Sequence, residues 1–176
     1  MTTAIYAIGH STRPLDKFIE ILLAHHITVL VDIRTVPRSR HNPQFNRESL
    51  EIELPKTKIK YRHLKELGGL RHPSKDSINV GWENASFRGF ADYMQTREFA
   101  EGIEKLIALS EKETVAIMCA EGNPFRCHRT LIADALTVRG VSVLHISSRT
   151  SAKPHTLTPF AVVDNTNITY PQVNIP

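Results

Sequence analysis

The sequence is poor in cysteine and in long hydrophobic runs, and each shortage excludes a class of protein. Two cysteines in 176 residues are too few for a disulfide framework, so we expect a reducing, cytoplasmic location. No apolar run approaches the ~18 residues of a membrane span, so we expect no membrane partner. The N-terminus lacks a basic stretch followed by an apolar one, and we therefore predict no signal peptide.

Positive charge is concentrated in one part of the chain. The net charge is only +4, but residues 34–75 contain eleven Lys and Arg and only four Asp and Glu. Between residues 76 and 121 the balance reverses, with four basic residues against nine acidic ones. Such a basic segment suits an anionic partner, a nucleic acid or a phosphorylated small molecule, and it is equally typical of a solvated face.

Short apolar runs alternate with amphipathic segments, which is the pattern of a parallel α/β fold. Strands are predicted at 5–8, 28–33, 59–61, 114–119 and 141–146, and helices at 15–26, 46–54, 87–94, 99–110 and 123–140. Ser11 or Thr12 is expected to cap the first helix, Asn46 the second and Asn123 the last, with Pro124 at its first position. Residues 71–85 show no regular pattern, as in a functional or mobile loop.

The predicted fold class is α/β, a three-layer sandwich with a mostly parallel sheet and helices on both faces. The length predicts a single domain over residues 1–176, with a core at about 4–149. The tail, 150–176, is extended or adds an edge strand near residues 161–163.

Polar residues follow four of the predicted strands, at 9–11, 32–34, 119–121 and 147–149. Because ligands of parallel α/β sheets bind outside the carboxyl ends of the strands, we predict a functional cleft there. The candidate anion-binding residues are Ser11, Asp32, Arg34, Arg38, Arg40, Arg126, His128 and Arg129. The candidate catalytic residues are Cys119, Glu121, His10 and Cys127.

The two cysteines differ in their predicted surroundings. Cys119 ends a strand and is either reactive or a small buried apolar residue. Cys127 falls near a predicted helix N-terminus between Arg126 and Arg129, which favours a thiolate, so it is the better nucleophile if it faces the cleft. The two thiols could also approach disulfide distance. Their spacing matches no standard zinc pattern, so we predict no metal, and the sequence identifies no cofactor.

The other candidate site residues could also have a purely structural role. Glu121 is either a general acid or base, or an ion-pair partner of a nearby arginine. His10 and Asp32 either contact a ligand or form a hydrogen-bonded network that holds the loops. Cysteine phosphatases place an arginine six positions after the cysteine, whereas here that position is Phe125.

Five ordered motifs resemble those of one known family. They are Ile8-Gly9-His10-Ser11, Asp32-Ile33-Arg34 with Pro37-Arg38-Ser39-Arg40, Leu67-Gly68-Gly69, Phe90-Ala91-Asp92-Tyr93-Met94, and Met118-Cys119-Ala120-Glu121 with Cys127-His128-Arg129. The family is that called domain of unknown function 488. The resemblance spans about residues 5–148 and implies an intracellular α/β domain with its marked residues on strand-end loops. It implies no particular activity.

Three functions remain open. The first, which we favour, is an enzyme acting on a nucleotide, a nucleic acid or another phosphate-bearing substrate. The second is a non-catalytic nucleic-acid-binding module in which Phe45, Tyr61 and His63 stack on bases. The third is a thiol-based redox protein. The oligomeric state is left open by the sequence.

Overall fold

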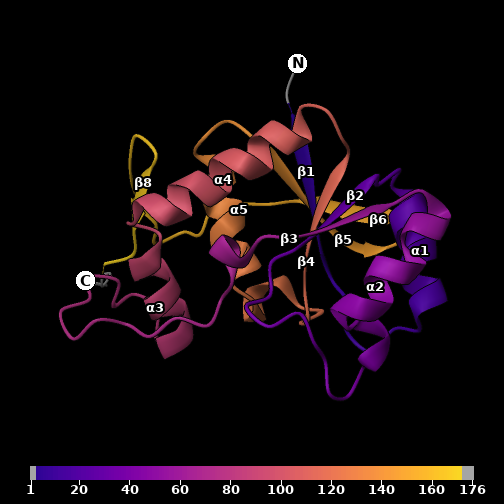
Figure 1. Ribbon diagram of the computed structural model, residues 1–176. Helices are drawn as coiled ribbons and strands as arrows, with labels where there is room; N and C mark the ends of the chain where they lie inside the picture. Colours follow the sequence, from indigo (N-terminus) through magenta and orange to yellow (C-terminus); the bar gives the residue numbers. More distant parts are fainter. Residues whose placement is uncertain (1–2, 172–176) are drawn as a thin grey trace.

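A six-stranded sheet with helices on both faces forms the centre of the computed structural model, which describes residues 3–171 (Figure 1). The strand order is β3-β2-β4-β1-β5-β6. Neighbouring strands from β3 to β5 are parallel, and β6 pairs antiparallel with β5 at the edge. This confirms the predicted three-layer α/β architecture.

The elements follow the predicted order along the chain. The strands of the main sheet are β1 (Ala4–Gly9), β2 (Val29–Asp32), β3 (Lys60–His63), β4 (Val115–Cys119), β5 (Ser142–Ser148) and β6 (Ser151–Pro154). The α-helices are α1 (Leu15–Ala24), α2 (Arg47–Glu53), α3 (Ala85–Tyr93), α4 (Arg97–Ser110) and α5 (Arg129–Thr137). Within residues 3–171, no helix has both the length and the apolar character needed to cross a membrane.

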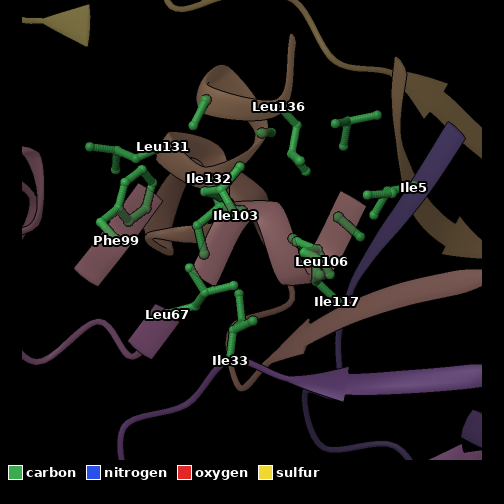
Figure 2. Packing of buried hydrophobic residues seen from close by; sticks show 14 of the residues in the cluster. Ile5, Ile33, Leu67, Phe99, Ile103, Leu106, Ile117, Leu131, Ile132 and Leu136 are labelled. Atoms are coloured by element: carbon green, nitrogen blue, oxygen red, sulfur yellow. The ribbon is translucent and has the colours of Figure 1, made fainter. Parts of the chain in front are cut away.

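The strand β4 shows how the two cores form. Successive side chains of a strand point to opposite faces, so Ile117 and Cys119 join the cluster under α3, α4 and α5, whereas Met118 joins the cluster under α1 and α2. Figure 2 shows the first cluster, in which Ile103 of α4 and Ile132 of α5 pack on the side of the sheet that carries Ile117. The second face, with α1 and α2, lies on the right in Figure 1.

Two predicted helix caps are wrong. No side chain caps α1, which begins after Pro14 instead of after a capping Ser11 or Thr12. Asn46 does precede α2, but its side chain accepts the N–H of Ser39 at 2.7 Å, so it ties down the preceding loop. The side-chain caps that the structure does contain include Asn84 on α3.

The tail also differs from the prediction. A strand does form near residues 161–163, as β7 (Val162–Asp164), but it pairs with β8 (Asn167–Thr169) in a separate two-stranded sheet. The strand that this part of the chain adds at one edge of the main sheet is β6, whose polar sequence gives no strand signal. Beyond β8, Tyr170 is fully buried and donates its hydroxyl to Asp134 of α5 at 2.7 Å. This bond fastens the tail to the core.

The crossovers place a crevice at the carboxyl ends of the strands. The chain leaves β1 through α1 on one face of the sheet and leaves β4 through α5 on the other face. Because β1 and β4 are neighbours, their exit loops separate there, which is the usual position of a ligand site in this class of fold.

The buried carboxylate of Asp134 gives a test of how the tail is held. Its oxygens accept hydrogen bonds from His155, from the N–H of Thr158 and from Tyr170. We expect Tyr170→Phe to lower the free energy of unfolding by about 1–3 kcal/mol, because one buried oxygen loses its donor. Urea unfolding would measure this. Tyr6→Phe is the matched control, and an equal effect of both variants would contradict the prediction.

Candidate functional site

A pocket of about 310 Å³ opens at the carboxyl ends of β2 and β4. Both cysteines line it and are almost fully buried, so they form its floor. Glu121, Arg38 and Arg126 are exposed and form its rim. The pocket therefore combines two sulfur atoms with exposed charged groups, at the place where the sequence predicts a cleft.

Cys119 and Cys127 are joined in a disulfide, with their Cα atoms 7.2 Å apart. Cys119 ends β4, and Cys127 follows a 3-10 turn at Pro124–Arg126. The structure thus brings the two predicted cysteines together at the floor of the pocket. Reduction of this bond would leave two thiols facing the same cavity.

The predicted helix start at Asn123 is wrong. Asn123 caps only the short 3-10 turn, where its side chain accepts the N–H of Phe125 at 2.9 Å. The backbone is extended at Cys127, and α5 begins at Arg129. This break lets Cys127 turn toward Cys119, which a continuous helix from Asn123 would not allow.

Arg129 holds the loop that follows β4. Its side chain is 1% exposed, and it donates to the backbone oxygens of Glu121 at 2.6 Å and Gly122 at 2.8 Å. It also lies 2.8 Å from the sulfur of Cys119. Burial lowers the pKa of Arg129 to about 10, so it stays charged at neutral pH. After reduction of the disulfide, this positive charge would lie next to the Cys119 sulfur, whereas the sequence placed its arginines around Cys127.

His128 links three parts of the site. Its Nε2 lies 2.9 Å from the backbone oxygens of both Ile33 and Leu67, so this nitrogen carries the hydrogen. Nδ1 is then an acceptor, and it lies 3.6 Å from the sulfur of Cys127. Burial lowers the pKa of His128 to about 4, which keeps the ring neutral. A Cβ at Gly69 would lie 2.5 Å from Nδ1, so only glycine fits beside this ring.

His10 and Asp32 form a hydrogen-bonded network with Arg34, which was one of the two interpretations predicted for His10 and Asp32. Asp32 is fully buried and accepts from Arg34 Nη2 at 2.7 Å and from Tyr61 at 2.5 Å. His10 Nδ1 donates to the backbone oxygen of Ser11 at 2.7 Å, and its ring stacks on Phe45. Of these residues only Arg34 lines the pocket, so His10 and Asp32 lie behind the site.

The remaining candidates are divided between the pocket and the surface. Ser11 and Arg40 do not line the pocket, whereas Arg38 and Arg126 do. The pocket also contains Gly69 and Phe87, which the sequence did not single out, although Gly69 lies in one of the five motifs. No cluster of three or more His, Cys, Asp or Glu in residues 3–171 is arranged to hold a metal ion.

The stacking residues of the nucleic-acid-binding hypothesis are mostly core residues. Phe45 is fully buried and Tyr61 is 9% exposed. His63 uses Nε2 to contact the backbone oxygen of Arg34 at 2.7 Å. The structure therefore contradicts base stacking by this set of residues, because two of its three rings belong to the core.

The buried histidines predict how stability depends on pH. Burial lowers the pKa of His10 and of His128 to about 4, below the 6.5 of a free histidine. The unfolded chain binds more protons between these values, so the free energy of unfolding should fall as the pH falls from about 6.5 to about 4. Each histidine contributes at most about 1.4 kcal/mol per pH unit.

The variant His128→Gln separates this effect from the protonation of carboxylates. We expect the free energy of unfolding of this variant to change less with pH between about 6.5 and about 4. The number of protons taken up on unfolding should be smaller by up to one. Urea unfolding at several pH values would measure both proteins. Identical pH dependence in the two would show that His128 is not held neutral by the fold.

Comparisons with known proteins agree with the motifs. The model of the family described as domain of unknown function DUF488 matches residues 14–136, which include the loop after β2, the whole of β4 and most of α5. No curated protein and no solved structure matches the chain. Since the matched region covers more than half of the sequence and contains both cysteines, the chain belongs to the DUF488 family.

Proposed function

We propose that this protein is an enzyme that binds a phosphate-bearing substrate in the pocket and attacks it with Cys119 in its reduced form. The observation that carries the proposal is the Cys119 sulfur, which lies 2.8 Å from the buried guanidinium of Arg129 at the floor of a pocket with free arginines at its rim. A nucleophilic cysteine needs a nearby positive charge and access to a cavity, and Cys119 has both.

The rim supports an anionic substrate. The guanidiniums of Arg38 and Arg126 make no hydrogen bond or ion pair within residues 3–171, and both line the pocket. Ala120 and Glu121 also line the pocket, and their N–H groups donate no hydrogen bond within the described part of the chain. Arginine side chains and consecutive free N–H groups are the usual ligands of phosphate oxygens in proteins.

The reaction that fits these groups is a displacement at phosphorus. The Cys119 thiolate would form a bond to phosphorus while the bond from phosphorus to the leaving oxygen breaks. Glu121 would donate a proton to that oxygen and later take one from the water that releases phosphate from sulfur. The arginine follows Cys119 by seven positions instead of the six of cysteine phosphatases, so the phosphate would be held by a different loop geometry.

Alkylation of the reduced protein tests the nucleophile and the anion site together. We expect iodoacetamide to modify Cys119 faster than Cys127, because Arg129 stabilises the Cys119 thiolate. Inorganic phosphate should slow this modification, and the double variant Arg38→Ala, Arg126→Ala should lose the protection. Peptide mass spectrometry would follow both sites. Arg40→Ala is the matched control, since Arg40 is exposed but lies outside the pocket.

Two results would contradict the proposal. Faster modification of Cys127 would mean that Cys119 is not the nucleophile. An equal alkylation rate with and without phosphate in the wild-type protein would remove the evidence for an anion site.

The second candidate is a thiol-based redox function, and the disulfide between Cys119 and Cys127 favours it. In this case both cysteines are needed, whereas the displacement needs only Cys119. We expect the reduced protein to lose two hydrogen atoms on treatment with oxidised glutathione, which would be reduced to two thiols. Mass spectrometry should then find the Cys119–Cys127 linkage. Its absence after oxidation would exclude the redox function.

A further inference from the structure

A second cavity lies beside the pocket and has an aromatic lining. This aromatic groove, of about 530 Å³, is lined by Trp82, Phe87, Phe125, Phe160 and Arg126, together with Glu83, Asn84 and Gly81. Phe87 and Arg126 also line the pocket that holds the cysteines. The two cavities are therefore neighbours, and a single ligand can reach into both.

Most of the aromatic groove is built from rings that pack on one another. Trp82 packs edge to face against Phe87, Phe160 and Tyr170, with ring centroids 5.1, 4.9 and 5.4 Å apart. These rings come from the segment before α3, from α3 itself and from the tail, which lie side by side in Figure 1. Such mutual packing forms the wall of the groove before any ligand binds.

Phe125 is the exception in this group. Its side chain is 76% exposed, and its ring packs against no other aromatic ring within residues 3–171. It extends from the 3-10 turn that separates Cys119 from Cys127, directly before Arg126. Proteins that bind single-stranded nucleic acids stack bases on aromatic rings and hold phosphates with positive charge, and Phe125 next to Arg126 offers both groups.

We propose that the substrate is a nucleoside phosphate, with its base against Phe125 in the aromatic groove and its phosphate in the pocket beside Arg126. The proposal rests on the function proposed above and narrows its substrate class. Arg126 lines both cavities, so it lies where the base and the phosphate of one nucleotide would meet. The exposed carboxylate of Glu83 can accept hydrogen bonds from the amino group of a base.

Binding can be measured through the fluorescence of Trp82, because it is the single tryptophan of the chain and lines the groove. The probes are AMP, a six-residue oligoadenylate and ribose 5-phosphate, which carries the phosphate without a base. We expect AMP or the oligoadenylate to bind at least about 10-fold more tightly than ribose 5-phosphate, as stacking on one aromatic ring provides. Tighter binding of AMP than of the oligoadenylate would identify the substrate as a free nucleotide. Tighter binding of the oligoadenylate would identify it as a nucleic-acid strand.

The variant Phe125→Ala should remove this preference and leave the affinity for ribose 5-phosphate unchanged. Because Phe125 is exposed, the variant should fold normally. Ile52→Ala is the matched control, since Ile52 is 61% exposed on α2 and lies outside both cavities.

The outcomes distinguish this inference from the proposed function. If ribose 5-phosphate binds as tightly as AMP and the oligoadenylate, or if Phe125→Ala weakens all three equally, the nucleoside assignment is wrong while the phosphate site stands. If none of the three binds and phosphate gives no protection from alkylation, the proposed function fails as well.

Discussion

The burial of the Arg129 guanidinium is the interaction on which the site depends. A charged group that leaves water must recover its hydrogen bonds from the protein. The Nη1 and Nη2 atoms of Arg129 do so from the backbone oxygens of Glu121 and Gly122 and from the sulfur of Cys119, whereas its buried Nε has no hydrogen-bond partner among the described residues. These partners fix the course of the loop after β4. The cost of burying this cation is therefore offset in part by contacts that also shape the pocket.

His128 has a similar role on the other side of the pocket. It joins the end of β2, through Ile33, to the turn at Leu67, and it places an acceptor next to Cys127. Each of the two cysteines thus has its own polar neighbour, a cation for one and a neutral imidazole for the other. This difference gives the two sulfur atoms different chemistry although they lie in the same cavity.

Much of the fold could be predicted from the sequence, because apolar periodicity determines which segments become strands and helices. The place of the site followed from the polar residues at the strand ends. The break at Cys127 could not be predicted, since Asn123 and Pro124 form a normal helix start in isolation. The hydrogen on His128 Nε2 depends on carbonyls 95 and 61 residues away, and no local pattern reports them.

Gly9 is a position at which the structure does not accept a side chain. A Cβ at this position would overlap the backbone oxygen of Glu121 and would lie 2.6 Å from Arg129 Nη1. The Glu121 oxygen belongs to the backbone of this loop, and the Arg129 side chain is held there by its hydrogen bonds to that loop, so neither atom can move without loss of these contacts. Residue 9 and the loop after β4 are therefore not independent in evolution: a side chain at residue 9 becomes acceptable only in a lineage that has already rebuilt the loop and, with it, the floor of the pocket.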